Sequence, residues 1–387
     1  MKAWNYSGKT QTLVHLELPA KTNQPSEKQL PQYQVVSKIN NGAMEISGSP
    51  IRLQNLFAEI EFSDSKGIVA DSIAANLWDQ PLSARLFKEN NQQQLSFNTK
   101  VMPENLNHFV DIPWNQLISG AIEIDALLSN NRQEGLSLDI SSNLEDVAIN
   151  LPSPFAKSKN SLKELQVKLH FNPSLNRLES KLGDLWASDI YYQQGQFERG
   201  SITFDRNDIK PKAKQLILGA KLPTIDMEQW GPVTELFSAN NKKTSSLQAE
   251  FDLNLDYWQI FGTKFKDITA TIKPLGKNTE ILFDSDHSAG QIILPLKGNG
   301  VPQVNLSKLI LQTNTKNTGL AMDPRNITAV DFSVDQLSLA AKELGSISFQ
   351  LRPEISGASF SNISGDIFGL KPGAFSVSYT HLTLPTT

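Results

Sequence analysis

Alternation of apolar and polar residues is the commonest local pattern in this chain. In the segment 165–171 every second residue is apolar and those between are polar, and the segments 251–255, 268–272 and 346–351 alternate in the same way. A two-residue period places successive side chains on opposite faces of a strand. Because parallel strands covered on both faces read as continuous apolar runs instead, the alternation predicts mainly antiparallel sheet with one wetted face.

Helical periodicity is rarer. Residues 226–239 place their large apolar side chains near one face, with Asp226 as a plausible N-cap. Residues 103–119 show similar spacing, but Pro113 interrupts it. We therefore predict a few short helices packed against the ends of the sheet. Between the strands, sequences such as Asn40-Asn41-Gly42 predict turns.

An ungapped internal repeat relates two segments of the second half. Residues 251–274 overlay residues 330–353 with apolar positions in register, and Asp256 and Asp335 fall at the same place. Each copy predicts a strand, a short break near that aspartate, and a second strand closed by proline. Repeats that stack apolar faces on their neighbours build extended folds. The alternative is a coincidence between two amphipathic hairpins.

Composition narrows the function classes. The chain has 36 Lys+Arg against 40 Asp+Glu, so it lacks the basic excess that nucleic-acid binding favours. The absence of Cys excludes thiol catalysis, cysteine-ligated zinc and disulfides. No apolar run approaches the roughly 18 residues that a membrane-spanning helix needs.

Candidate chemistry is sparse. None of the five His lies at the spacing of a zinc-binding pair. Asp284–Gly290 lacks the third acid and the closing Glu of a calcium loop, which favours a plain hairpin turn. Asp252 and Asp256 lie on the polar side of a strand without an acid–base partner nearby in sequence, which favours a solvated role. We therefore expect no catalytic residue, no metal and no cofactor.

The last residues of the chain differ in character from the rest. Residues 377–387 resemble a translated sequencing adapter, and such a segment is left out of fold reasoning. We expect native sequence to end near Ser376 and residues 1–376 to be a fragment of one extended, repeat-built β-groove. Its candidate sub-repeats are residues 1–130, 131–225 and 226–376.

Four passages in order carry a resemblance to a known family. They are Ser49–Leu56 with Asp79–Arg85, Leu138–Leu144 with Asn150–Lys157, Ile225–Trp230, and Gln336–Pro353. In the second passage a strand leads into a leucine-proline-x-proline sequence and a lysine, here Leu151–Pro154 and Lys157. Taken together, these passages resemble the YhdP-type members of the AsmA superfamily, and they extend over most of residues 49–370.

The resemblance implies a function in the cell envelope. It implies a parent protein that is anchored in the inner membrane of a Gram-negative bacterium and carries a long β-groove across the periplasm, as bridge-like lipid transfer proteins do. The implied cargo is phospholipid, moved toward the outer membrane without catalysis. Membranes would be contacted through parts of the parent outside this chain.

The expected fold is mostly β, a long curled antiparallel sheet that forms an open groove, with a few short helices. Acyl chains would lie on its apolar face, where each buried methylene contributes about 0.8 kcal/mol. The predicted lining residues are Phe251, Leu253, Leu255, Ile268, Ile272, Phe332, Val334, Ile347, Phe349 and Leu351. The same alternation also fits the closed sandwich core of a structural or scaffolding envelope protein. An enzyme is the third class, which the sparse chemistry disfavours.

Overall fold

The structure is a computed structural model, and the description below concerns the residues that it describes. These are residues 4–18, 32–47, 49–64, 66–109, 113–131, 135–205, 209–226, 229, 232–233, 248–260, 263–295, 300–311, 329–354, 357–367 and 375–379. The chain divides into two compact units, one made of residues 1–199 and 229–244, the other of residues 200–228 and 245–387.

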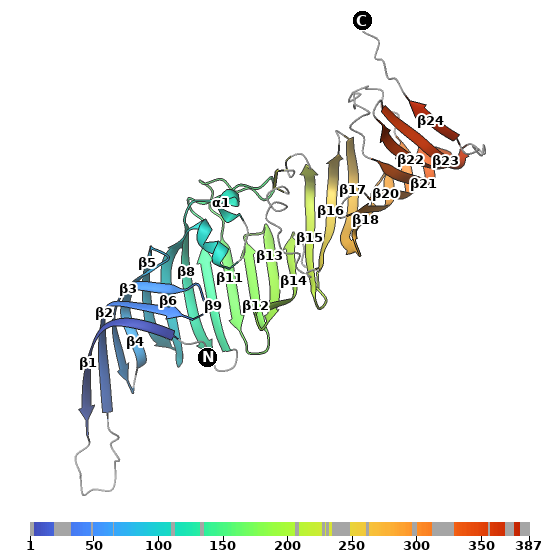
Figure 1. Cartoon of the computed structure of the whole chain (residues 1–387). Helices are drawn as coiled ribbons and strands as arrows, with labels where there is room; N and C mark the ends of the chain where they lie inside the picture. Colours follow the sequence, from blue (N-terminus) through green and yellow to red (C-terminus); the bar gives the residue numbers. More distant parts are fainter. Residues whose placement is uncertain are drawn as a thin grey trace. The chain divides into compact units, whose positions relative to one another are not determined.

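The first unit is a single-layered antiparallel sheet whose strands follow one another in chain order (Figure 1). Each strand is joined to the next by cross-strand pairs. The strands are β1 (Trp4–Glu17), β2 (Gln32–Ile46), β3 (Arg52–Ser63), β4 (Gly67–Leu77), β5 (Gln80–Glu89), β6 (Gln92–Val101), β8 (Ile122–Asn131), β9 (Gly135–Ser142), β11 (Leu165–Phe171), β12 (Asn176–Leu182) and β13 (Trp186–Gln193).

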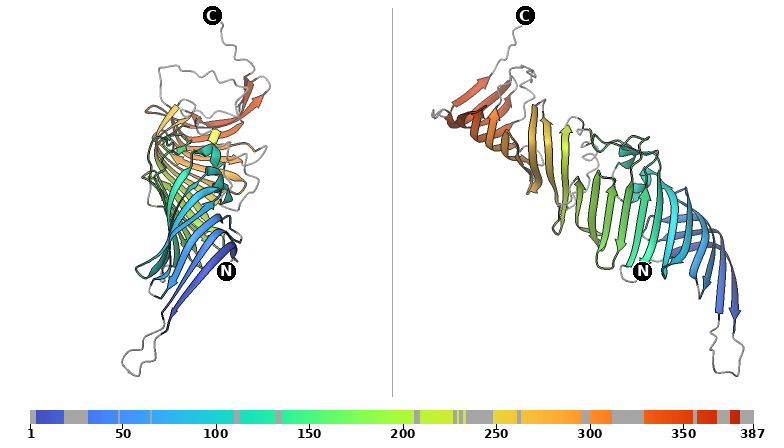
Figure 2. Two further views of the ribbon diagram at one scale, coloured as in Figure 1. Left: turned by 90° about the vertical axis from the view of Figure 1, so that its left-hand side faces the viewer. Right: turned by 180° about the vertical axis from the view of Figure 1, so that it is seen from behind.

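The second unit is also a sheet of strands in chain order, and a view from behind shows the same succession (Figure 2). Its strands are β14 (Gln196–Phe204), whose first residues belong to the first unit, β15 (Gln215–Asp226), β16 (Gln248–Ile260), β17 (Thr263–Leu275), β18 (Asn278–Asp284), β19 (Ser288–Pro295), β20 (Gln303–Leu311), β21 (Val330–Leu339), β22 (Lys342–Glu354), β23 (Gly357–Ile367) and β24 (Phe375–Tyr379).

The prediction of a mostly β fold with an open, largely antiparallel sheet and a few short helices is confirmed. The sheet is mixed, however, because β14 with β15, β15 with β16, and β20 with β21 pair in parallel. A parallel neighbour needs a long crossover connection. The residues between these parallel neighbours, 205–214, 227–247 and 312–329, are more numerous than those between antiparallel neighbours of this unit.

The structure agrees with some of the strands, breaks and helices predicted for single segments and differs from others. The strand predicted at 165–171 is β11, residue for residue. The chain breaks predicted near Asp256 and Asp335 are wrong as turns, since β16 and β21 run through these residues and end only at Ile260 and Leu339. At Asp335, however, the register of β21 against β22 shifts between Val334 and Leu337. Most of the helix predicted at 226–239 lies outside the described residues; Gln229, Pro232 and Val233, which are described, are helical. Asp226 belongs to β15 as its last residue.

The turn predicted at Asn40-Asn41-Gly42 is also wrong, because these residues lie inside β2. The register shifts there against both β1 and β3, and Asn41 has a φ of 51°, so the segment is a bulge in a continuous strand. A Cβ added to Gly8 on β1 would lie 2.7 Å from the Cα of Gly42. Glycine at both positions therefore allows the two backbones to approach closely at the bulge.

Two short helices follow β6, where the sequence predicted a helix interrupted by Pro113. They are η1 (Pro103–His108), a 3₁₀ helix, and α1 (Trp114–Leu117), and they lie at one end of β8 and β9 (Figure 1). The short strands β7 (Ile118–Ser119) and β10 (Ala148–Ile149) pair beside them. Among the described residues, no helix has the length and apolar character needed to cross a membrane.

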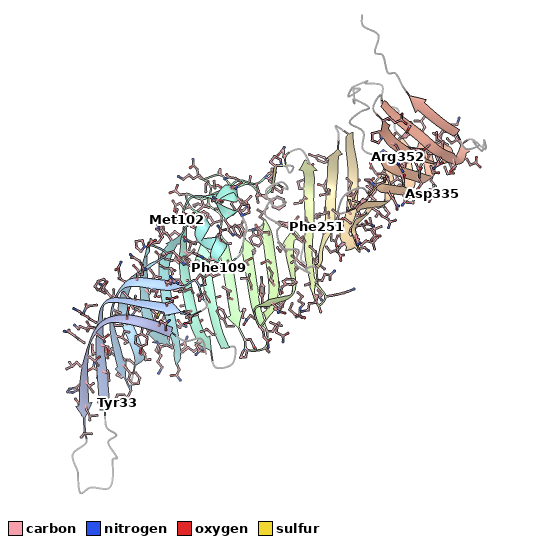
Figure 3. The ribbon with its side chains drawn as sticks, viewed as in Figure 1. Tyr33, Met102, Phe109, Phe251, Asp335 and Arg352 are labelled. Carbon is pink, nitrogen blue, oxygen red and sulfur yellow. The ribbon has the colours of Figure 1, made fainter. Side chains whose placement is uncertain are left out.

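We call residues 102–109, 113–120 and 143–158 the cover. Its apolar side chains Leu106, Ile118, Leu144, Val147 and Ile149 pack against one end of the first unit's sheet. The sheet residues beneath them are Val101, Ile122, Ile124, Leu165, Leu182 and Trp186. Figure 3 shows Met102 and Phe109 in the part of the cover that flanks η1. The cover thus supplies the local core of this unit at that end of the strands.

The two faces of the second unit's sheet differ in character, and one of them carries cross-strand ion pairs. On that face the Glu280 carboxylate accepts hydrogen bonds from Lys273 Nζ at 2.9 Å and from Gln291 Nε2 at 2.5 Å. These contacts lower the pKa of Glu280 below its ordinary value of 4.5, with the hydrogen bond from Lys273 as the largest cause. The Glu280 side chain is only 10% exposed and that of Lys273 40%, so this pair lies partly shielded from water on the polar face of the sheet.

The lowered pKa of Glu280 predicts a pH dependence of stability. A carboxyl whose pKa is lower in the folded than in the unfolded chain contributes stability that is complete above the unfolded pKa and is lost as pH falls through the folded pKa. We expect Glu280→Gln to lower the urea midpoint near neutral pH, and the difference from wild type to shrink as pH falls below 4.5.

The matched control for this measurement is Glu354→Gln, at an exposed position on β22. This variant should stay close to wild type across the same pH range. A Glu280→Gln difference that remained constant down to about pH 3 would show that the carboxylate of Glu280 does not act through its charge.

Candidate functional site: an apolar sheet face in each unit

The ten predicted lining residues all lie on two hairpins of the second unit, β16–β17 and β21–β22. Phe251 pairs with Ile272 and Leu255 with Ile268 across the first hairpin. Phe332 pairs with Phe349 across the second hairpin. Leu253 pairs with Ala270, Val334 with Ile347, and Leu351 with Val330. Because paired residues point to the same face, the structure brings all ten side chains to one face of the sheet.

Cross-strand pairing extends these hairpins into rows that run from strand to strand. Row C is apolar throughout and consists of Ile202, Leu218, Phe251, Ile272, Ile281, Ile292, Val304, Phe332 and Phe349. Row D lies two residues further along the strands and consists of Phe204, Ala220, Leu253, Ala270, Phe283, Gly290, Leu306, Val334, Ile347 and Gly365. With strands about 4.8 Å apart, each row is about 40 Å long.

Exposure changes across the rows. Phe251 in row C is 38% exposed, whereas Val334 in row D is 1% exposed. Leu255 and Ile268, which form the next pair beyond row D, are 4% and 3% exposed. At β16, Phe251 of row C is exposed and Leu253 of row D is half-buried, so row C is the more accessible row there. The pair beyond row D is closely packed.

Large and small residues alternate along much of row D. Ala220 and Ala270 lie on either side of Leu253, and Phe283 separates Ala270 from Gly290. A Cβ added to Gly290 would lie 2.3 Å from the carbonyl oxygen of Asn305, so only glycine fits beside β20 here. The surface of row D is therefore uneven, with small residues set between large ones.

The first unit carries two rows that the sequence analysis did not name. Row A consists of Ala58, Ile73, Ala84, Phe97, Ala126, Ile140, Val167, Ser180 and Ser188. Row B consists of Ala70, Leu86, Leu95, Leu128, Leu138, Leu169, Leu178 and Ile190. Alternation within single strands was visible in the sequence. Only the registers, however, reveal that six leucines from six strands form one row.

The opposite face of the first unit is charged. Arg177 donates to Asp189 at 2.8 and 3.1 Å and lies 2.9 Å from Glu179, and this hydrogen bonding to Asp189 raises the pKa of Arg177. His170, which the sequence placed on the polar side of β11, lies 3.1 Å from the Glu179 carboxylate. Lys168 pairs with Asp139 at 3.4 Å. The sheet therefore separates an apolar face from a face that carries ion pairs between side chains.

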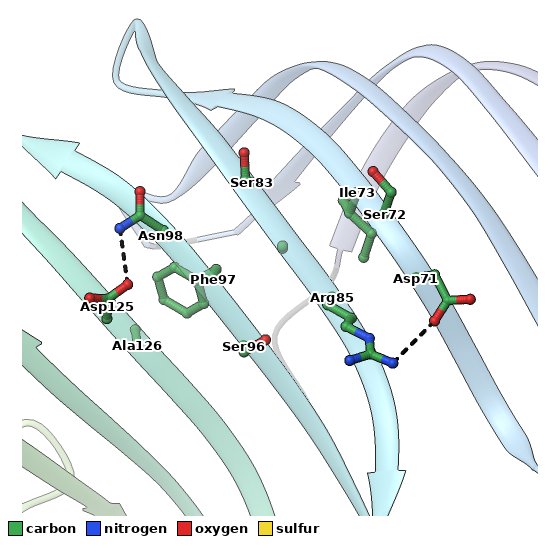
Figure 4. Close-up of a pocket in the computed structure, with 11 residues that line it drawn as sticks. Asp71, Ser72, Ile73, Ser83, Arg85, Ser96, Phe97, Asn98, Asp125 and Ala126 are labelled. Carbon is green, nitrogen blue, oxygen red and sulfur yellow. Dashed lines mark hydrogen bonds and ion pairs between the residues drawn. The ribbon is translucent and has the colours of Figure 1, made fainter.

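A shallow depression of about 380 Å³ lies over β4, β5, β6 and β8 (Figure 4). Within it Arg85 pairs with Asp71 at 3.4 Å, and the amide of Asn98 donates to Asp125 at 3.0 Å. Asp71 and Asp125 thus each have a side-chain partner within the depression.

In the described part of the chain, no group of three or more His, Asp or Glu side chains gathers as a metal site would require. The predicted hairpin turn near His287 is confirmed between β18 and β19.

Comparison of the whole chain with known protein families gives a match. A family model described as YhdP protein matches residues 1–367, a range that contains rows A to D and the cover. No curated protein and no solved structure matches the chain. The family match covers nearly the whole sequence and agrees with the resemblance carried by the four ordered passages. The chain belongs to the YhdP family.

Proposed function

We propose that this chain is a periplasmic segment of a cell-envelope protein and that it conducts phospholipid along its apolar sheet faces without catalysis. The observation that carries the proposal is the run of apolar and glycine side chains in rows C and D, which is unbroken from β14 to β22. Membership of the YhdP family supports it, since that family is not generally catalytic.

The rows suit an acyl chain for a physical reason. Each methylene removed from water contributes about 0.8 kcal/mol wherever it lies along an apolar row, so a chain can shift from one strand to the next with little change in free energy. A specific pocket would instead hold the lipid in one place. The phospholipid head group, which is charged or polar, would remain at the wetted margin of the sheet, because its burial without a partner costs several kcal/mol.

The ten residues predicted from the sequence contribute to this path at different depths. Phe251, Ile272, Phe332 and Phe349 in row C are proposed to contact acyl chains directly. The rings of Phe332 and Phe349 stack with their centroids 4.9 Å apart. Leu253, Val334 and Ile347 in row D form the floor beside them. Leu255 and Ile268 support that floor, and Leu351 extends the face next to Phe360 on β23.

The stacked rings of Phe332 and Phe349 are the positions at which we expect lipid to be captured. Photo-crosslinking residues at Phe332 and Phe349 in the intact parent protein should capture phospholipid, detected by mass spectrometry. Ser333 and Ser348 are matched controls, because they pair with each other on the opposite face of the same hairpin. Equal capture at all four positions would contradict the proposal, and no capture at either phenylalanine would favour a scaffolding role.

A charge placed within row C should interrupt the proposed path. Ile281→Asp places a carboxylate between Ile272 and Ile292. Loss of contact with about two methylenes corresponds to roughly a ten-fold weaker interaction. A crosslinker at Ile272 should therefore capture about ten-fold less phospholipid in this variant than in the wild type.

The control for this experiment is Leu282→Asp, one residue further along β18. Leu282 points to the opposite face and is 38% exposed, so this variant adds the same charge without entering row C. Capture at Ile272 should then stay near the wild-type level. A similar loss in both variants would indicate a general effect on the sheet and would count against a path along row C.

A further inference from the structure

The cover contains a buried lysine that is tied to the backbone. Lys157 is 5% exposed, and its Nζ donates to the carbonyl oxygens of Leu144 at 2.7 Å, Val147 at 2.6 Å and Ser158 at 3.2 Å. An ammonium group has three protons to donate, so these three carbonyls use all of them. Burial lowers the pKa of Lys157, and the charge of Lys163 adds to this effect.

The turn that Lys157 holds is strained and closely packed. Leu144 and Asp146 have φ values of 51° and 59°, in the left-handed region that a residue such as leucine seldom adopts. The side chains of Leu144 and Val147 are nevertheless almost fully buried against the sheet. A strained backbone of this kind persists only where its surroundings fix it. The hydrogen bonds from Lys157 to the carbonyl oxygens of Leu144 and Val147 supply such a constraint.

The turn around Asp146 also packs closely against Gly120. Gly120 has a φ of 100°, and a Cβ added there would lie 2.3 Å from the carbonyl oxygen of Asp146. On the far side of η1, Trp78 stacks on His108 and meets the edge of Phe109, and its Nε1 donates to the carbonyl oxygen of Pro50. The cover is therefore fixed at both ends, by Trp78 at one and by the turn around Lys157 at the other.

The cover packs on sheet residues that lie next to row A. Ile124 and Leu165, which the cover packs against, lie on β8 and β11 two residues from Ala126 and Val167 of row A. Their side chains point to the same face as row A, because the strand period is two. The cover thus occupies the apolar surface beside row A and contacts neither Leu128 nor Leu169 of row B within that cluster.

We propose that Lys157 is the latch of a cover that forms the side wall of the lipid path in the first unit. This inference rests on the proposed function, because a wall has meaning only if acyl chains lie on rows A and B. With the latch closed, the cover keeps acyl chains off Ile124 and Leu165 and confines them to the rows. With the latch released, the strained turn relaxes and this surface becomes available to lipid.

The test uses the full-length parent protein with phospholipid vesicles. Lys157→Met keeps an unbranched apolar side chain up to Cε but lacks the ammonium group and with it all three hydrogen bonds. We expect amide hydrogen exchange over residues 144–149 to become at least ten-fold faster in this variant, and phospholipid capture by a crosslinker at Ile124 to rise several-fold. Capture by a crosslinker at Phe97 in row A should remain. Lys159→Met, an exposed lysine in the same segment, is the matched control and should change neither quantity.

The outcomes separate the two proposals. Unchanged exchange and unchanged capture at Ile124 in Lys157→Met would overturn the latch. Absence of lipid at Phe97 in the wild type would overturn the proposed path in this unit, while the exchange of residues 144–149 would still decide whether Lys157 fixes the cover. If Lys157→Met does not fold, Gly120→Ala provides a second route to a displaced turn, since its Cβ would push against Asp146. It should then give the same increases in exchange and in capture at Ile124.

Discussion

Cross-strand register is the constraint on which the rest of this structure depends. A strand has a side-chain period of two, so a shift of one residue in any pairing would move all of its apolar residues to the opposite face. In each unit the strands keep a register that aligns their apolar residues in rows; serines end row A, and glycines stand at two places in row D. Rows A to D therefore exist only because successive strands, antiparallel and parallel, place their apolar residues on the same face.

Departures from regular pairing preserve this agreement. Between β4 and β5 the register shifts between Ala70 and Ile73, yet both residues remain on the face of rows A and B through their partners Leu86 and Ala84. Between β19 and β20 the shift falls at Gly290, where a side chain would collide with the neighbouring backbone. Bulges and glycines thus bend individual strands without breaking the rows.

A single-layered sheet with one apolar face needs something to cover that face. At one end of the first unit's strands, the protein's own cover supplies Leu144 and Val147, and an internally bonded lysine fixes their backbone. Along rows A to C many large side chains are only half-buried. This contrast between a self-covered end and accessible rows is the physical basis for proposing an apolar ligand, since exposed apolar rows of this length are costly in water.

The sequence by itself determined the type of structure and, within regularly alternating strands, which apolar residues share a face. Alternation at 165–171 and around Phe251 and Phe349 was sufficient, because the period of a strand is local. Tertiary structure alone decided the parallel pairs, the continuation of β2 through Asn40–Gly42, and the leucines of row B, because register joins residues that are distant in the chain. Lys157 is the clearest case. Its place after a proline-rich sequence carried only a resemblance, while its role depends on carbonyl groups that the fold brings to it from ten and thirteen residues away.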